Sequence, residues 1–406
     1  MLTTEQTKQF SDILEELGNA LDITKDQHDA AVKSYRFVGE WLADENSPLA
    51  KYFPEILPQG SFLLGTMTRP LLDADELDID LVCRLEGKQP LWTQYDLKKI
   101  VGDRLKANGI LLKLLVTPDG RRCWTLQYAD SAKFHMDILP SIVSSGYRTI
   151  LNKALSEKVA DTNSLAIRIT DKKEKNYLVS TSPNEWLKTN PFGYGIWFEQ
   201  RASLDFQKAI LLSESVAPVP KFQAKKLPLQ RVVQILKRHR DIKFNGDDDK
   251  PISIIITTLA ASSYNKETDI LTALTNVIQQ MPNRIEERFS AKHGRMIKWV
   301  PNPVNAEENF ADKWAETPRK QTLFYKWLEE VRLDIQSVTQ QRGINLIQES
   351  FTKSFGKNSV EKAFNSYGEN LRKLREGGNQ FMTKTTGTLG AIGTVKNPNH
   401  NFHGDE

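Results

Sequence analysis

Two aspartates in an apolar stretch of this chain have the spacing of a metal-binding pair. Asp78 and Asp80 alternate with apolar residues in the sequence Leu-Asp-Ile-Asp-Leu. This alternation predicts a β-strand in which both carboxylates point to the same side. Two negative charges held that close repel each other, and a bound divalent cation, which prefers carboxylate oxygens, relieves the repulsion. The pair therefore predicts a metal-dependent site.

A Gly-Ser pair upstream of these aspartates could hold a phosphate group. Gly60 has no side chain, so its backbone can approach a ligand closely, and Ser61 can offer a hydroxyl and a main-chain N–H at the start of a helix. The Lys-Ser or Lys-Thr of a Walker A loop does not follow. A phosphate-binding turn beside two metal-binding carboxylates suggests nucleotidyl transfer.

A third aspartate occurs in a later apolar stretch. Asp137 and His135 alternate with apolar residues in Phe-His-Met-Asp-Ile, so both would project from the same face of a strand. A single aspartate in a strand is most often a surface residue, but the preceding pair favours a place for Asp137 in the same site. Asp73 and Asp75 lie in the Asp-rich run before the pair and fit a solvated turn better.

Hydrophobic periodicity and turn residues predict the elements that position these side chains. We expect helices at residues 1–43, 93–107, from 182, 229–240, from 251, 267–290, 317–340 and 350–377. We expect strands at residues 77–83, 110–116, 123–128 and 132–140. A turn between the second and third strands would make them a hairpin beside the Asp78 strand.

The second half of the chain contains the strongest local positive charge. The amphipathic segment 229–240 gathers its basic residues on one side: Arg231, Lys237, Arg238 and Arg240. Such a run is usually a solvated face, and the alternative is a surface that contacts a bound triphosphate. Ser253 follows Pro251 and is therefore expected near a helix N-terminus.

Composition excludes several other classes of protein. The chain has 406 residues and a net charge of +4, which is too small to indicate nucleic-acid binding. Its two cysteines, Cys83 and Cys123, lie in strand-like apolar contexts and predict packing, with no disulfide framework or zinc ribbon. No apolar run reaches membrane-spanning length and the N-terminus lacks the regions of a signal peptide, so we expect a cytoplasmic protein.

These features together resemble the bacterial cGAS/DncV-like nucleotidyltransferases (CD-NTases), the cyclic-oligonucleotide synthases of CBASS anti-phage defence. The resemblance extends to about Gly378 and rests on four features: Gly60-Ser61, Asp78-Ile79-Asp80, Asp137, and the basic helix followed by Lys-Pro-Ile-Ser-Ile-Ile-Ile. It implies an α+β fold, in which a polymerase-β-like core of mixed sheet and helices packs against a helical domain like that of oligoadenylate synthase. Nucleotides would bind in the cleft between them.

The family layout implies four segments along this chain. Residues 1–43 would be a helical segment that packs across both lobes, and residues 44–204 the nucleotidyltransferase core. Residues 205–380 would form the helical domain, and residues 381–406 a flexible tail.

The resemblance also assigns roles to the candidate residues. Asp78, Asp80 and Asp137 would bind two Mg²⁺ ions, or Mn²⁺ in their place, with Asp137 nearest the attacking ribose hydroxyl. Gly60 and Ser61 would hold the phosphates of the donor nucleotide.

In the helical half, Lys237 and Ser253 match positions that family members use on the triphosphate, and Arg240 or Lys243 could take their place. The implied substrates are nucleoside triphosphates, ATP or GTP or both. The implied product is a cyclic di- or trinucleotide second messenger that acts on a separate effector.

Two further features bear on partners. Animal cyclic GMP-AMP synthase, a relative of this family, carries a Cys/His zinc insertion that is missing from this sequence. The resemblance therefore implies neither double-stranded DNA sensing nor sequence-specific nucleic-acid binding. Some family members are joined through the C-terminus to other molecules by a ubiquitin-transfer-like partner, and this or another regulatory partner is possible for a chain ending in Phe-His-Gly-Asp-Glu.

Two alternative functions stay open at the level of the sequence. One is a transferase that makes linear oligonucleotides or adds nucleotides to RNA or protein. The other is a catalytically silent nucleotide-binding regulator, against which the three clustered acids argue.

Overall fold

The computed structural model describes residues 2–71, 76–128, 133–157, 162–204 and 221–398. Asp73 and Asp75, for which the sequence predicts a solvated turn, lie outside these ranges. The C-terminal residues 399–406, where a conjugating partner would act, lie outside them as well.

The chain divides into two compact units. The first, called the sheet unit, comprises Ile23–Lys226 and Pro301–Glu308. The second, called the helical unit, comprises Met1–Asp22, Leu227–Val300 and Asn309–Glu406. Within the described ranges, no helix is both long enough and apolar enough to cross a membrane. The domain boundaries expected from the sequence stay a prediction.

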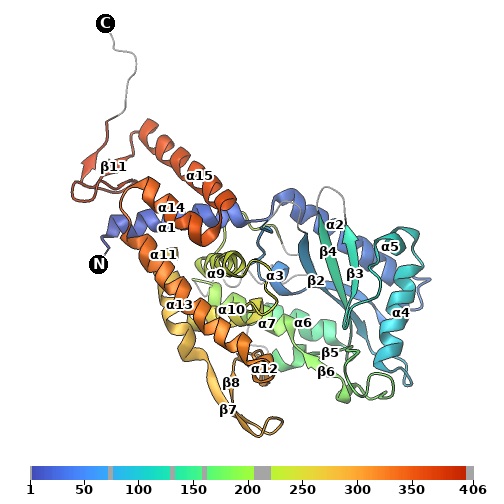
Figure 1. Cartoon of the computed structure of the whole chain (residues 1–406). Helices are drawn as coiled ribbons and strands as arrows, with labels where there is room; N and C mark the ends of the chain where they lie inside the picture. The colour runs from blue at the N-terminus through green and yellow to red at the C-terminus, as the bar shows by residue number, and fades with distance from the viewer. Residues whose placement is uncertain (1, 72–75, 129–132, 158–161, 205–220, 399–406) are drawn as a thin grey trace. The chain divides into compact units, whose positions relative to one another are not determined.

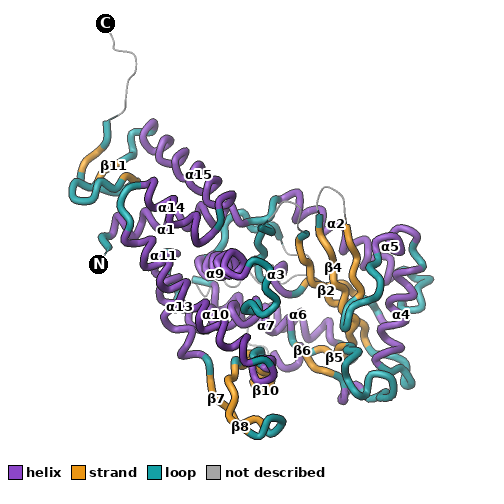
Figure 2. Tube along the Cα trace, in the orientation of Figure 1, coloured by secondary structure: helices purple, strands orange, loops and turns teal. Residues whose placement is uncertain are grey.

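The sheet unit is built on a mixed six-stranded sheet, whose strands are among those drawn in orange in Figure 2. The order is β1-β2-β4-β5-β6, and β3 also pairs with β4. Strands β2 and β4 are parallel and the other pairs are antiparallel. Figure 1 shows β2, β4 and β3 side by side. This combination of mixed sheet and helices confirms the α+β class.

The strands of this unit are β1 (Glu55–Pro58), β2 (Leu77–Glu86), β3 (Trp124–Tyr128), β4 (Phe134–Val143), β5 (Ile167–Ile169) and β6 (Leu187–Thr189), with β9 (Pro301–Asn302) and β10 (Asn305–Asn309) forming a separate pair. The helices are α2 (Lys25–Ala43), α3 (Gly60–Leu63), α4 (Gln94–Lys106), α5 (Gly109–Leu114), α6 (Tyr147–Glu157) and α7 (Pro191–Ala202), with short 3-10 turns at Ala50–Tyr52, Thr162–Leu165 and Pro183–Glu185.

Apolar side chains cover both faces of the sheet. On one face, Ile79 and its alternate neighbours pack with α2, α4 and α5. On the other face, a second core forms around Val82 and Leu139. Those two residues come two positions after Asp80 and Asp137 and point to the same side, because side chains alternate along a strand. The aspartates therefore lie at the edge of the second core, where the apolar cover ends.

The strand expected at residues 110–116 is wrong, because this segment begins with helix α5 (Gly109–Leu114). The side chain of Asn108 accepts hydrogen bonds from the main-chain N–H groups of Ile110 and Leu111, at 2.9 and 3.1 Å, and so caps the helix. The following Leu-Leu-Lys-Leu favours a helix, and Leu111 is fully buried. Strand β3 pairs along its length with β4, and segment 110–116 reaches β3 only at its end, through an antiparallel bridge between Leu115 and Leu126 and a hydrogen bond from the Val116 N–H to the Thr125 carbonyl at 2.9 Å.

Two other helical expectations also differ from the structure. The N-terminal segment is two helices, α1 (Thr4–Leu21) and α2, because Thr24 begins a new helix with a capping box. The helix expected from residue 182 is only the 3-10 turn Pro183–Glu185, since the chain then pairs with β5 as strand β6. The helix expected at residues 93–107 is confirmed as α4, which Thr93 caps.

The helical unit contains most of the remaining helices. They are α1, α9 (Pro228–Phe244), α10 (Ser253–Ser263), α11 (Ile270–Gln280), the 3-10 turn Met281–Arg284, α12 (Asp312–Glu316), α13 (Pro318–Gln340), α14 (Ile344–Phe355) and α15 (Lys357–Glu376). Its strands are β7 (Glu286–Ser290), β8 (Arg295–Trp299), β11 (Phe381–Met382), β12 (Leu389–Gly390) and β13 (Val395–Lys396).

Two segments of this unit differ from the expectation. The helix expected at residues 267–290 ends at Gln280, and after a turn containing Pro282 the chain enters the hairpin β7–β8, which turns at Gly294. The tail expected to be flexible forms, up to residue 398, a sheet in which β11 pairs with β12 and β13. Backbone pairing orders this Gly- and Thr-rich segment, and Gln380, Thr383 and Thr388 are buried in it.

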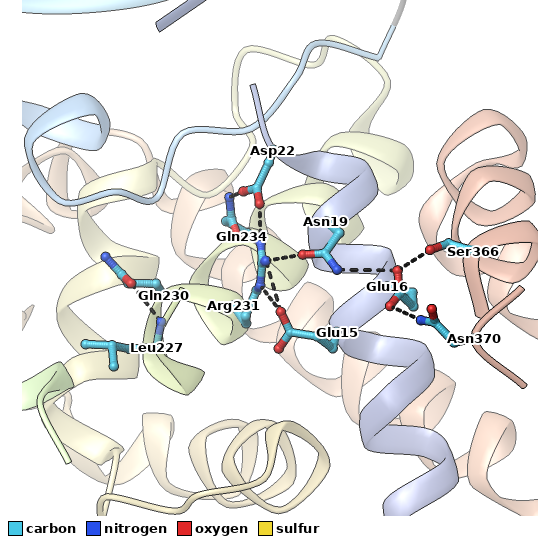
Figure 3. Close-up of polar contacts among 10 residues, drawn as sticks. All are labelled: Glu15, Glu16, Asn19, Asp22, Leu227, Gln230, Arg231, Gln234, Ser366 and Asn370. Atoms are coloured by element: carbon cyan, nitrogen blue, oxygen red, sulfur yellow. Dashed lines mark hydrogen bonds and ion pairs between the residues drawn. The ribbon is translucent and has the colours of Figure 1, made fainter. Parts of the chain in front are cut away.

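Arg231 in α9 is neither a solvated residue nor one turned toward a ligand. Its guanidinium is fully buried in the helical unit and pairs with Glu15 at 3.0 Å and Asp22 at 2.8 Å (Figure 3). It also donates to the side-chain oxygens of Asn19 and Gln234. These partners satisfy a buried charge, so Arg231 ties α9 to α1.

Candidate active site

Three aspartates of the sheet unit come together as the sequence predicts. Asp78 and Asp80 project from β2, and Asp137 projects from the parallel neighbour β4, directly opposite Asp80 in the register. One carboxylate oxygen from each of the three lies within 4.8 Å of the others. Among the described residues this cluster offers three hard oxygen ligands, which fits Mg²⁺, Mn²⁺ or Ca²⁺ better than a soft metal.

Gly60 lies against one of these carboxylates. Its backbone has φ +58°, in the left-handed region, and a Cβ atom at this position would lie 2.6 Å from Asp80 Oδ2. The neighbouring Gln59 N–H donates to the main-chain oxygen of Asp80 at 2.9 Å. Only glycine combines this conformation with this approach, so the turn after β1 is built against Asp80.

Ser61 follows in the four-residue helix α3 (Gly60–Leu63) and is partly exposed. Its carbonyl accepts a hydrogen bond from the N–H of Thr66 at 3.0 Å, which closes the turn. Gly60 and Ser61 therefore lie next to the aspartates. Their contact with a phosphate group stays a prediction.

The other two predicted residues belong to the helical unit. Lys237 lies in α9, and Ser253 begins α10. The hydroxyl of Ser253 accepts a hydrogen bond from Arg240 Nη1 at 2.9 Å, and Lys243 pairs with Asp334 at 3.1 Å. Arg240 thus joins Ser253 in one hydrogen-bonded group, while Lys243 contributes to a different one. Triphosphate binding by Lys237 and Ser253 stays a prediction.

Thr125 holds the third aspartate and was not identified from the sequence. Its hydroxyl donates to Asp137 Oδ1 at 2.5 Å, and the two residues are directly opposite each other in the antiparallel pair β3–β4. The sequence Trp-Thr-Leu-Gln-Tyr could have indicated this role, because side chains alternate along a strand and Thr125 and Gln127 therefore lie on the same face.

His135 lies between two carboxylates at the exposed end of the site. Its Nε2 is 3.2 Å from Asp78 Oδ1 and its Nδ1 is 3.4 Å from Glu76 Oε2. The hydrogen bond to Asp78 raises the pKa of His135 to about 9, with the charges of Asp78 and Asp137 adding to the effect and burial opposing it. The sequence placed His135 on the same face as Asp137 but gave no reason to connect it with Glu76.

The charges of this cluster act on the thiol of Cys123, which is not poised as a nucleophile. Burial, followed by the negative charges of Asp137 and Asp80, raises the pKa of its thiol to about 12. The thiolate is therefore disfavoured, which agrees with the packing role expected for both cysteines.

Comparison with known proteins connects this geometry to a family. Residues 54–141, which include all three aspartates, match the family described as cyclic GMP-AMP synthase DncV-like, nucleotidyltransferase domain. A protein named c-di-GMP synthase from Roseivirga ehrenbergii is 29% identical over 397 residues, covering 96% of this chain and 95% of that protein.

Solved structures show the same fold. CdnG from Bradyrhizobium diazoefficiens, named a cyclic dinucleotide synthase, was solved in complex with GTP and superposes with a TM-score of 0.65 at 21% identity, covering 88% of this chain and 97% of that one. CdnC from E. coli MS115-1, solved in a complex with HORMA-deltaN, superposes with a TM-score of 0.56 at 15% identity, covering 86% and 97%.

Proposed function

We propose that this chain is a cGAS/DncV-like nucleotidyltransferase that joins nucleoside triphosphates into a cyclic dinucleotide at Asp78, Asp80 and Asp137. The observation that carries the proposal is the convergence of these three carboxylates on two neighbouring strands, within 4.8 Å of one another. The names of the relatives support a cyclic product, and the complex of CdnG with GTP supports GTP as a substrate.

The three carboxylates would hold two divalent cations, for which we propose Mg²⁺, with Mn²⁺ as a substitute. When bound, such ions stabilise the negative charge that develops on the attacking and leaving oxygens. Rigid strands hold Asp80 and Asp137 side by side on one face of the sheet, and Thr125 donates a hydrogen bond to the carboxylate of Asp137. Asp137 would lie nearest the attacking ribose hydroxyl.

In the reaction itself, the hydroxyl oxygen of one nucleotide forms a bond to the α-phosphorus of another, and the bond to pyrophosphate breaks. Gly60 and Ser61 hold the phosphates of the donor in this proposal, because their turn is built against Asp80. Lys237 and Ser253 are the candidates for further triphosphate contacts, and Arg240, which donates to Ser253, would act with them. A second round on the linear intermediate would close the ring.

The family resemblance also supports a proposal about where the enzyme works and which proteins it works with. The enzyme would work in the cytoplasm, and its product would activate a separate effector in CBASS anti-phage defence. A regulatory partner is compatible with this layout, since the related fold of CdnC was solved in a complex with HORMA-deltaN. A ubiquitin-transfer-like partner acting on the C-terminus is the other candidate.

The test is product analysis with the full chain. The protein is incubated with each labelled nucleoside triphosphate and with all four together, in Mg²⁺ or Mn²⁺, and the phosphatase-treated products are identified by mass spectrometry. We expect a phosphatase-resistant cyclic dinucleotide that contains guanosine and that disappears when EDTA is added. A linear product or a labelled macromolecule would instead support the alternative transferase, and nucleotide binding without turnover would support a silent regulator.

A further inference from the structure

A chain of hydrogen-bonded side chains leads to Asp78 along the same sheet face. Gln127 Nε2 donates to Glu76 Oε1 at 2.7 Å, and Glu76 Oε2 lies 3.4 Å from His135 Nδ1. The other ring nitrogen of His135 lies 3.2 Å from Asp78 Oδ1. The catalytic roles assigned above leave Gln127, Glu76 and His135 without a function.

The strand register holds this chain in place. His135 on β4 is directly opposite Asp78 on β2, and Gln127 on β3 is directly opposite His135. Both contacts of the ring are to carboxylates, which accept hydrogen bonds. The imidazole is therefore held at both ends.

We propose that His135, held by Glu76, is a positioning residue that orients the carboxylate of Asp78 for cation binding. This inference rests on the proposed function and adds to it the group that prepares one of the metal ligands. One oxygen of Asp78 receives the ring N–H, which fixes the plane of the carboxylate. The other oxygen then stays available to a cation.

Asp78 needs such support more than the other two acids do. Its side chain is 62% exposed, whereas Gly60 lies against Asp80 and Thr125 donates to Asp137. An exposed carboxylate rotates freely, and a cation that binds it must also restrict that rotation. Partners that orient metal ligands typically contribute about 10- to 100-fold to metal affinity or activity.

The direction in which metal affinity changes when His135 is removed distinguishes a positioning role from a simple effect of charge. If His135 only occupied space or contributed charge beside the cation, its removal would leave metal binding unchanged or make it tighter. Positioning predicts the opposite, since Asp78 would lose its fixed orientation.

The experiment is a Mn²⁺ titration of the full chain without nucleotide, followed by electron paramagnetic resonance. Four proteins are compared: wild type, His135→Ala, His135→Gln and Asp78→Asn. His293→Ala is the control, because His293 lies in the turn of the β7–β8 hairpin in the helical unit. Thermal midpoints report whether each variant is folded, and initial rates separate kcat from KM.

We expect His135→Ala to weaken Mn²⁺ binding about tenfold and to lower kcat with little change in the KM for nucleotide. His135→Gln keeps one N–H donor and should recover part of the affinity, so it tests the inference even if His135→Ala does not fold. His293→Ala should match the wild type.

Two results would overturn the inference in distinguishable ways. If Asp78→Asn binds Mn²⁺ as the wild type does, both the proposed metal site and the positioning role are wrong. If Asp78→Asn loses binding while His135→Ala and His135→Gln bind Mn²⁺ equally well or more tightly than the wild type, the metal site stands and the positioning role is wrong.

Discussion

Asp80 and Asp137 lie directly opposite each other on two parallel strands at the centre of the sheet. Residues paired across a sheet project to the same side and are separated by the strand spacing of about 5 Å. The backbone pairing of β2 and β4 therefore sets the separation of the two carboxylates before any ligand binds. Such preorganisation suits a site in which charge must be stabilised at fixed positions.

Because Gly60 lies close to Asp80, we expect that one added methyl group at this position lowers activity. Gly60→Ala should place its Cβ against the Asp80 carboxylate and move it, which lowers product formation. The left-handed backbone adds a stability cost of about 1 kcal/mol. Gly87→Ala is the matched control, because Gly87 has φ +79° and no heavy atom within 4 Å of the added Cβ.

Both variants should lose a similar amount of stability in urea unfolding, and only Gly60→Ala should lose activity. Equal turnover in the two proteins would show that the contact between Gly60 and Asp80 has no role in the reaction.

We expect the rate of the reaction to depend on the hydroxyl of Thr125, which donates to Asp137. Thr125→Val keeps the shape of the side chain but removes the donor to Asp137 Oδ1, so kcat should fall about tenfold. Thr125→Ser keeps the donor and should retain most of the activity. Steady-state rates of the two variants check this, and a serine variant as slow as the valine variant would exclude the hydrogen bond as the cause.

Buried Arg231 predicts a large effect on stability. Arg231→Ala leaves the carboxylates of Glu15 and Asp22 without their buried partner, which should cost about 3–5 kcal/mol of unfolding free energy. Arg372→Ala is the control, since Arg372 is half exposed and pairs only with surface glutamates of its own helix. That substitution should cost less than about 1 kcal/mol.

Urea unfolding curves of the two arginine variants make the comparison. Equal stability losses would mean that the Arg231 cluster contributes no more than an ordinary surface ion pair.

His239 predicts how stability depends on pH. Trp327 Nε1–H donates to His239 Nδ1 at 3.1 Å, and His239 Nε2 lies 3.0 Å from Asp334. The indole can only donate, so the structure holds the neutral ring, and burial lowers the pKa of His239 below its ordinary 6.5.

The folded protein therefore binds this proton less readily than the unfolded chain does. The contribution of His239 is complete above about pH 6.5 and is lost as the pH falls below that value. Asp334 follows in a separate, more acidic window, because the hydrogen bond from His239, together with that from Lys243, lowers the pKa of Asp334 to about 2. Its contribution is complete above about pH 4 and is lost toward pH 2.

His239→Gln checks the first window. Glutamine offers an acceptor to Trp327 and a donor to Asp334 but does not titrate. Urea midpoints at about pH 7.5 and about pH 5 should therefore differ less for the variant than for the wild type. An identical loss in both proteins would place the pH dependence elsewhere.

Local patterns in the sequence were sufficient to predict that Asp78, Asp80 and Asp137 lie close together. Alternation around Asp78, Asp80 and Asp137 is a property of two neighbours on each side, and it correctly predicted which face each carboxylate would share. The periodicity of residues 93–107 was equally local, and helix α4 confirms it.

The sequence could not supply what depends on long-range pairing. The contact of His135 with Asp78 exists only because β4 lies parallel to β2 in one register, across a connection of about 50 residues. Arg231 was misread for the same reason, since its acidic partners come from the other end of the chain. The strand wrongly expected at 110–116 reflects a short apolar run, which periodicity alone cannot assign.

The most direct measurement is product formation by Asp78→Asn, Asp80→Asn and Asp137→Asn, compared with the surface control Asp103→Asn. Each substitution in the cluster should reduce the proposed cyclic product at least about 100- to 1000-fold while urea unfolding shows an intact fold, and the control should keep the wild-type rate. Wild-type product formation in any one of the three cluster variants would contradict the claim that these carboxylates together carry the reaction.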